Sequence, residues 1–269
     1  MKPGERIGYG ATADIYAWGD GQVLKLLHEG MPAEHAREEA EATRLAYAAG
    51  IPAPATGDLI EVDGRQAIVF ERLSGPSMLQ RIGARPWTLP RYARLLAELQ
   101  VATHRSSAPS LPPLRRRLAR NIEWNDSLPE PTKKAVLNVL GRLPDGDCLC
   151  HGDLHPDNVL LTPRGPVIID WTTAARGNRV ADLARTCLLL RLGQAPEGRL
   201  SGWVDRLGRG LFLHFYLRRY LELLPTPATD IAAWEAPVAA ARLIERRPQS
   251  EREALKRLIA ARLGGGVWT

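Results

Sequence analysis

The stretch HGDLHPDN, residues 151–158, is the most polar motif of the chain, and VIIDW, residues 167–171, follows it closely. The segments around both motifs are short and apolar, which predicts strands. These predicted strands are residues 148–150, 159–161 and 167–170. A hairpin joining the last two would bring Asp170 to face the polar loop, so side chains distant in sequence can share one site.

Asp153 and Asn158 are five residues apart in this loop, and Asp170 ends the last predicted strand. Two carboxylates and an amide suit phosphoryl transfer, because this reaction needs positioning and charge neutralisation rather than covalent chemistry by the protein. One carboxylate would hold the attacking hydroxyl. The amide oxygen and the second carboxylate would hold Mg²⁺ against the phosphates, since Mg²⁺ favours few protein ligands plus phosphate oxygens. The alternative is that the three residues are unrelated polar loop positions.

The two motifs resemble those of the aminoglycoside phosphotransferase and choline kinase family, distant relatives of the protein kinases, and the resemblance spans nearly the whole chain. It rests on His-Gly-Asp, an Asn five residues after the Asp, and an Asp twelve residues beyond. The resemblance implies that Asp153 is the catalytic residue and that Asn158 and Asp170 bind the metal. It also implies an α+β, bilobal protein-kinase-like fold.

The roles expected for other polar residues around the loop differ from these. Asp157 stands where small residues are common in relatives, so it receives no role. His151 is expected to brace the loop backbone, whereas His155 either approaches the phosphates or caps the turn. Asp182 resembles a family Asp that braces the catalytic loop, which gives it a structural role.

The remaining pattern predicts a small β-rich N-lobe with one helix, residues 1–72, and a larger, mainly helical C-lobe, residues 73–269. The N-lobe would bind the nucleotide, and the C-lobe would carry the catalytic loop and the acceptor site. The expected N-lobe strands are residues 13–18, 23–27, 59–62 and 66–70, with a helix over 34–49. The expected C-lobe helices are residues 91–103, 132–143 and most of 181–264, interrupted near 225–227 and 248.

A glycine-rich segment, IGYGATAD, residues 7–14, precedes the first of these strands. Gly8 and Gly10 would let backbone N–H groups approach a phosphate, and Thr12 would add a hydroxyl contact. The pair of glycines alone is a weak pattern, and Ala13 replaces the third glycine of the protein-kinase pattern. The chain contains no GxxxxGK[ST] motif, which disfavours a P-loop enzyme.

Lys25 lies in the apolar segment VLKLL, residues 23–27, and is one of only five lysines against 31 arginines. A lysine in such a strand is often a surface residue on an edge. The resemblance instead implies that Lys25 neutralises the α- and β-phosphates and is fixed by a carboxylate of the next helix. Glu38, Glu39 and Glu41 are the candidates, and the family pattern favours Glu39.

Residues 70–73 stand where the hinge of a kinase binds the purine through its backbone. Because backbone contacts leave the side chains uninformative, ATP is the expected donor and GTP remains an alternative. The expected partners are Mg²⁺ and a small-molecule hydroxyl acceptor, with the protein a monomer or homodimer.

Composition narrows the class of protein. The formal net charge of +6 and the pI near 9.5 favour an acidic partner such as ATP. The arginines are scattered without interleaved aromatics, so nucleic acid is not expected. No apolar run approaches the roughly 20 residues of a membrane helix, and no apolar stretch follows Lys2, so a cytoplasmic protein without a signal peptide is expected. Zinc binding at Cys148 and Cys150 is disfavoured because no second ligand pair has zinc spacing.

The acceptor is the least constrained part of the prediction. An aminoglycoside-type antibiotic, and hence antibiotic resistance, is the first candidate. Such polycations call for carboxylates, but the acidic residues of the C-terminal region are balanced by arginines. These are Asp205, Glu222, Asp230, Glu235 and Glu245. A macrolide, peptide antibiotic, choline, another amino alcohol, homoserine or a sugar are alternatives, and so is a catalytically inactive kinase-like binding protein.

Overall fold

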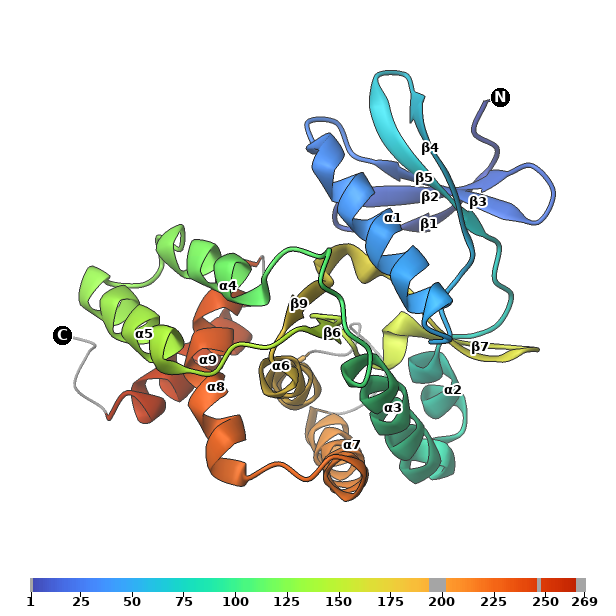
Figure 1. Cartoon of the computed structure of the whole chain (residues 1–269). Coiled ribbons are helices and arrows are strands. Elements are labelled where there is room, and N and C mark those ends of the chain that lie inside the picture. Colours follow the sequence, from blue (N-terminus) through green and yellow to red (C-terminus); the bar gives the residue numbers. More distant parts are fainter. Residues whose placement is uncertain (1, 194–201, 246–247, 265–269) are drawn as a thin grey trace. The chain divides into compact units, whose positions relative to one another are not determined.

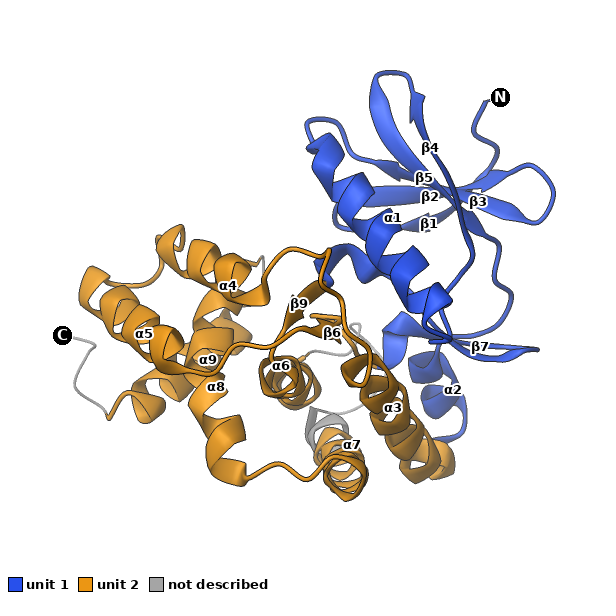
Figure 2. Cartoon of the chain, in the orientation of Figure 1, with its two compact units in different colours: residues 1–86, 156–174 blue, residues 87–155, 175–269 orange. Residues whose placement is uncertain are grey.

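The computed structural model describes residues 2–193, 202–245 and 248–264, and the chain forms two compact units (Figure 2). Unit 1 comprises residues 1–86 and 156–174, and unit 2 comprises residues 87–155 and 175–269. Unit 1 is therefore built from two separate pieces of chain.

These compact units differ from the two lobes expected from the sequence. The predicted N-lobe, residues 1–72, lies wholly in unit 1. Unit 1 also takes in residues 73–86 and 156–174, which the sequence analysis assigned to the C-lobe. The physical reason is a set of contacts between these segments, described below.

Unit 1 contains a five-stranded antiparallel sheet in the order β1-β2-β3-β5-β4 (Figure 1). Its strands are β1 (Arg6–Tyr9), β2 (Ala13–Trp18), β3 (Gln22–Leu27), β4 (Thr56–Val62) and β5 (Arg65–Glu71). Two tight turns make the predicted hairpins: Gly19 and Gly21 have positive φ between β2 and β3, and Asp63 and Gly64 between β4 and β5. Both hairpins are confirmed.

Helix α1 (Ala33–Ala48) packs against one face of this sheet. Its small buried residues Ala36 and Ala40 contact a cluster that includes Leu27 of β3. Because side chains alternate along a strand, Lys25 lies on the same face of the sheet as Leu27, while Leu24 belongs to a cluster on the opposite face. The strand alternation thus directs Lys25 towards the helix.

The second piece of unit 1 is a short hairpin with a 3₁₀ turn at each end. Its elements are η2 (Pro156–Asn158), β7 (Val159–Thr162), β8 (Gly165–Ile168) and η3 (Trp171–Thr173). Helix α2 (Met78–Ala84), from the first piece of unit 1, packs against η2 and β7. The Leu161 N–H donates to Pro76 O at 2.9 Å and the Ile168 N–H to Pro52 O at 2.7 Å. These backbone bonds attach the hairpin to the first piece of unit 1.

The described part of unit 2 is mainly helical, with one small two-stranded ladder, and η1 (Pro86–Thr88) begins at the last residue of the first piece of unit 1 (Figure 1). Its helices are α3 (Leu89–His104), α4 (Leu114–Glu123), α5 (Glu130–Arg142), α6 (Arg179–Leu192), α7 (Gly202–Leu223), α8 (Ala228–Arg242) and α9 (Gln249–Arg262). The ladder pairs β6 (Cys148–Cys150) with β9 (Ala175–Gly177). The helices predicted at 91–103 and 132–143 are confirmed within a few residues. Helix α4 lies in a proline-rich stretch where no helix boundaries were predicted.

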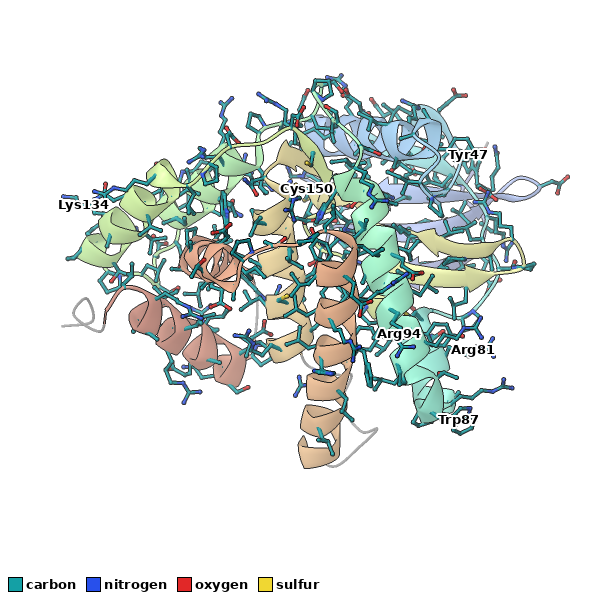
Figure 3. The ribbon with its side chains drawn as sticks, turned by 60° about the horizontal axis from the view of Figure 1, so that its bottom comes forward. Tyr47, Arg81, Trp87, Arg94, Lys134 and Cys150 are labelled. Carbon is teal, nitrogen blue, oxygen red and sulfur yellow. The ribbon has the colours of Figure 1, made fainter. Side chains whose placement is uncertain are left out.

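Helices α3 and α7 pack side by side, as do α6 with α8 and α8 with α9. Arg94 of α3 lies 5.6 Å from the ring centre of Phe215 of α7, a cation–π contact between the two helices. Cys150 is buried, whereas Lys134 projects from α5 at the surface (Figure 3).

Across the described ranges, no helix has the length and hydropathy of a bilayer-spanning segment.

The connection between the two pieces of unit 1 gives a test of stability. Gly75 has φ of 145°, and a Cβ there would overlap the carbonyl oxygen of Leu161. We expect Gly75→Ala to lower the free energy of unfolding by about 1–3 kcal/mol through strain and displacement of the β7 hairpin. Gly83→Ala is the control, because it lies in α2 with no atom within 4 Å and should stabilise by about 0.5–1 kcal/mol. Urea unfolding of both variants checks this, and equal effects would contradict it.

Candidate active site

A buried cluster of charges in unit 1 centres on Lys25. Its ammonium Nζ donates hydrogen bonds to Glu39 Oε1 at 2.6 Å, Asp170 Oδ1 at 2.9 Å and Thr172 Oγ1 at 3.0 Å. The Lys25 side chain is 11% exposed and that of Glu39 2%. Of the three glutamates considered from the sequence, Glu39 is the one that contacts Lys25.

Three elements place these side chains together. Strand β3 directs Lys25 towards α1, and α1 packs directly against η3, the turn that holds Thr172. Glu39 is buried on the same side of α1 as Ala36 and Ala40, which follows from the helical spacing of three to four residues. Asp170 immediately precedes η3. The cluster therefore joins the sheet, the helix and the β7–β8 segment.

The electrostatics of the cluster keep Lys25 charged. Burial alone would lower the pKa of Lys25, but the nearby carboxylates of Glu39 and Asp170 outweigh this and raise it above its ordinary value. The Asp170 side chain is 46% exposed, so it forms the solvent-facing side of the cluster. A fixed cation with a carboxylate beside it is the arrangement that phosphate groups and a metal ion require.

Asn158 and Asp170 flank the same end of the β7–β8 hairpin. Asn158 immediately precedes β7, and its carbonyl oxygen accepts a hydrogen bond from the Ile169 N–H at 3.0 Å. Asp170 has φ of 61°, in the left-handed region that non-glycine residues rarely adopt, and this conformation turns the chain from β8 into η3. Unusual backbone of this kind concentrates at functional sites.

The residues at this end of the hairpin fit Mg²⁺. One carboxylate and one amide supply hard oxygen ligands, and Mg²⁺ completes its shell with water and phosphate oxygens. Over the described part of the chain, no group of three His, Cys, Asp or Glu side chains could hold a metal alone. Asn158 and Asp170 therefore suit an ion that arrives together with a phosphate compound.

The glycine-rich segment forms the β1–β2 hairpin. A Cβ at Gly10 would lie 2.8 Å from the carbonyl oxygen of Ala13, so the turn requires glycine there. A Cβ at Gly8 would make only an ordinary contact with Ile15 at 3.4 Å. The Thr12 carbonyl accepts from the His28 N–H at 2.8 Å, which ties the turn to the end of β3. Contact of Gly8, Gly10 and Thr12 with phosphate stays a prediction.

The HGD loop belongs to unit 2, where Asp182 holds its backbone. The buried Asp182 carboxylate accepts from the His151 N–H at 3.2 Å and from the Gly152 N–H at 2.7 Å. His104 Nε2 lies 3.0 Å from the same carboxylate. His151 Nδ1 accepts from the Asp153 N–H at 3.2 Å. The bracing roles predicted for Asp182 and His151 are both confirmed.

Asp153 follows β6 in this loop and is surrounded by positive or protonatable groups of unit 2. Arg185 Nη2 lies 3.2 Å from its Oδ1, and His155 Nε2 lies 3.5 Å from its Oδ2. Burial opposes ionisation of Asp153, but the hydrogen bond of His155 and the charge of Arg185 hold its pKa well below the usual range. Asp153 is therefore an ionised carboxylate. His155, whose role was left open, lies beside it.

Sequence reasoning brought some of these groups together and missed others. Lys25, Glu39, Asn158 and Asp170 lie in unit 1, and Asp153 lies in unit 2. Thr172 and Arg185 were not predicted from the sequence. Thr172 follows the VIIDW motif by one residue, and Arg185 lies three residues after Asp182, so it shares that residue's side of α6. Spacing gives the place of both residues but not the partners that they contact.

A five-stranded antiparallel sheet with a buried Lys–Glu pair between β3 and α1, together with a mainly helical unit carrying an HGD loop, defines the protein-kinase-like fold. The family is also evident from the sequence. The model of the phosphotransferase enzyme family matches residues 4–223, and the chain belongs to this family. No curated protein matches the sequence.

Solved structures of small-molecule kinases share the fold. An aminoglycoside 3′-phosphotransferase of type VIII is 24% identical, with 89% of this chain and 90% of that chain covered and a TM-score of 0.60. A choline/ethanolamine kinase family protein from Mesorhizobium loti is 17% identical, with coverage of 98% and 92% and a TM-score of 0.60. Amicoumacin kinase hAmiN, in complex with AMP-PNP, Ca²⁺ and Ami, is 14% identical, with coverage of 97% and 87% and a TM-score of 0.63.

The brace of the HGD loop predicts a pH-dependent stability. Burial opposes ionisation of Asp182, but hydrogen bonds from His104 and Gln100 lower its pKa from 3.8 to about 2. A carboxylate with a lowered folded-state pKa contributes stability above its unfolded pKa and loses it as the pH falls through the folded value. We therefore expect Asp182→Asn to lose about 2 kcal/mol or more at pH 7, with a smaller difference from wild type as the pH approaches about 2.

Urea unfolding at several pH values between neutrality and about pH 3 measures this difference. Asp145→Asn is the control, because Asp145 is 60% exposed and its pairing with Arg115 at 3.7 Å is a surface contact. An Asp182→Asn deficit that is the same at every pH would contradict the ionised brace.

Proposed function

We propose that the protein transfers the γ-phosphate of ATP to a hydroxyl group of a small molecule, with an aminoglycoside-type antibiotic as the first candidate. The observation that carries the proposal is the buried cluster in which Lys25 joins Glu39 and Asp170. Phosphotransferases of the kinase type need a Lys–Glu pair to set the phosphates and an Asp to hold the metal. Membership in the phosphotransferase enzyme family supports the same chemistry.

In this proposal the nucleotide binds to unit 1. Lys25 neutralises the α- and β-phosphates, and Glu39 fixes the ammonium in place. The turn at Gly10 would present backbone N–H groups to phosphate, and Asn158 and Asp170 would hold Mg²⁺, which would supply positive charge to neutralise the phosphates. Backbone groups of residues 70–73, at the end of β5, bind the purine. Because these are backbone contacts, GTP is the alternative donor.

Asp153 receives the acceptor hydroxyl. Its low pKa makes it a weak base, so its first task is to orient the hydroxyl towards phosphorus as a hydrogen-bond acceptor. In a loose transition state the hydroxyl keeps its proton until the new bond is well advanced, and a weak base suffices for that late transfer. Asp182 and His151 keep the loop backbone in position for this.

The charge pattern of unit 2 bears on the acceptor. Glu235 lies 3.3 Å from Arg191 and 2.5 Å from Arg262, and Glu222 pairs with Arg218 at 3.1 Å. Both of these carboxylates are therefore balanced by arginines. The balance of charges favours an acceptor with few amines, such as an aminoglycoside of low charge. Choline, homoserine, sugars, macrolides and peptide antibiotics are the alternative acceptors. With ATP as donor, the reaction would take place in the cytoplasm.

An ATP-consumption screen over these acceptor classes tests the proposal, with GTP run beside ATP. Asp153→Asn should reduce turnover on the accepted substrate by about 10²–10⁴-fold, because the orienting charge is lost. Asp157→Asn is the control in the same loop. It should keep wild-type turnover, because Asp157 has no role in the proposed reaction and instead accepts a hydrogen bond from Ser77 Oγ at 2.6 Å. Near-normal turnover of Asp153→Asn would refute the role of Asp153. Nucleotide binding without turnover on any acceptor would favour an inactive binding protein.

Calorimetry tests the residues that are proposed to bind the nucleotide. Lys25→Ala should weaken Mg·ATP binding by about tenfold to a hundredfold, the worth of a charge-assisted contact, and should alter acceptor affinity less. Asp170→Ala should abolish the Mg²⁺ dependence of nucleotide binding. Lys256→Ala is the control, because Lys256 makes only a 3.9 Å surface contact with Glu253. A larger effect of Lys25→Ala on the acceptor than on ATP would refute the assignment.

A further inference from the structure

One arginine of unit 2 contacts the HGD loop in a way that the phosphotransfer chemistry above does not use. Arg185, in α6, donates from Nε to the Gly152 carbonyl at 3.0 Å and from Nη2 to Asp153 Oδ1 at 3.2 Å. The same Nη2 donates to Glu245 Oε1 at 2.6 Å. A planar guanidinium held at several points fixes the direction of each hydrogen bond it makes. Arg185 thereby fixes both the backbone and the side-chain direction at Asp153.

Arg185 is itself held by a chain of alternating charges. Glu245, just beyond α8, lies 3.0 Å from Arg242 Nη1, and Arg242 lies 2.6 Å from Glu251 in the first turn of α9. The side chains of Arg242 and Glu251 are 1% and 2% exposed. Ion pairs this deeply buried contribute little net stability, and their best-attested use is to specify a geometry. The series of ion pairs connects α8 and α9 with Asp153.

Bracing of the loop does not account for Arg185. Asp182 already binds the two backbone N–H groups of His151 and Gly152. Arg185 adds a hydrogen bond to the Gly152 carbonyl and, unlike Asp182, a contact with the Asp153 side chain. Its supporting carboxylate, Glu245, lies beyond residue 223, where the match to the family model ends. The connection to α8 and α9 is therefore outside the part of the chain that the family pattern describes.

We propose that Arg185 is a positioning residue that sets the orientation of the Asp153 carboxylate, and that Glu245 holds Arg185 in place for this task. Glu245 also shares the positive charge of Arg185, so that Asp153 keeps the capacity to accept the hydroxyl of a substrate. The C-terminal helices thereby act on the reaction through one hydrogen-bonded arginine. The inference rests on the proposed function, in which Asp153 receives the acceptor hydroxyl.

Steady-state kinetics of the full-length protein on the acceptor found by the screen test this proposal. Arg185→Gln should lower kcat by about tenfold to a hundredfold, the cost of misplacing a reacting group, while the KM for ATP stays unchanged. Arg185→Lys should restore part of kcat, because it keeps the charge but loses the planar fork. Glu245→Gln should lower kcat in the same direction by less. Arg191→Gln is the control, since Arg191 lies on the same helix and pairs with Glu235 away from the loop.

Two further measurements separate positioning from a merely structural role. The acid limb of the kcat profile should move to higher pH in Arg185→Gln, because loss of the cation raises the pKa of Asp153 and its ionised form is lost sooner on acidification. The double variant Asp153→Asn/Arg185→Gln should be no slower than Asp153→Asn alone, since Arg185 acts through Asp153. Thermal unfolding of each variant reports whether it is folded.

Unchanged kcat in folded Arg185→Gln, or an additive loss in the double variant, overturns the inference. If Arg185→Gln fails to fold, Arg185→Lys and Glu245→Gln decide the matter, and wild-type kcat in both overturns it. Failure of the proposed function is a different result: Asp153→Asn itself keeps normal turnover. An impaired Asp153→Asn beside wild-type-like Arg185 variants refutes the positioning role alone.

Discussion

A buried ammonium group must be compensated, and the organisation of unit 1 follows from this requirement at Lys25. The apolar strand β3 places the charge beneath α1, where water cannot solvate it fully. Glu39 comes from the helix and Asp170 from the turn after β8, so two carboxylates offset the loss of hydration. Meeting this requirement brings together the sheet, the helix and a hairpin more than a hundred residues further along the chain. The same arrangement leaves Asp170 facing solvent, as the proposed metal and phosphate binding requires.

The sequence predicted those parts of the structure that depend on local pattern. The hairpins around Gly21 and Gly64 follow from turn residues between alternating strands, and the helices from their apolar periodicity. The pairing of Lys25 with Glu39 was favoured over two neighbouring glutamates only through the family resemblance. The helical spacing that places Glu39 on the same side as Ala36 and Ala40 was a second, unused signal for this choice.

The parts that the sequence did not predict depend on contacts between distant residues. The hydrogen bond between Ser77 and Asp157 spans 80 positions, and the ion pair between Arg185 and Glu245 spans 60. No local pattern encodes such a partnership, and an arginine on a helix is most often a solvated surface residue. For the same reason the boundary expected at residue 72 does not coincide with the compact units. Contacts of the β7–β8 hairpin with Pro52 and Pro76 assign it to the first of them.

The two-piece construction of unit 1 limits how this protein can be divided. A fragment ending at residue 86 would contain Lys25 and Glu39 but not Asp170, so the ammonium would lose one of its two carboxylates. The β3 face would also lose the turn that packs against α1. The complementary fragment would carry a hairpin whose backbone partners at Pro52 and Pro76 are missing. Unit 1 is therefore not a transferable module: recombination or gene fusion at the end of its first piece would separate groups that stabilise one another only within a single chain.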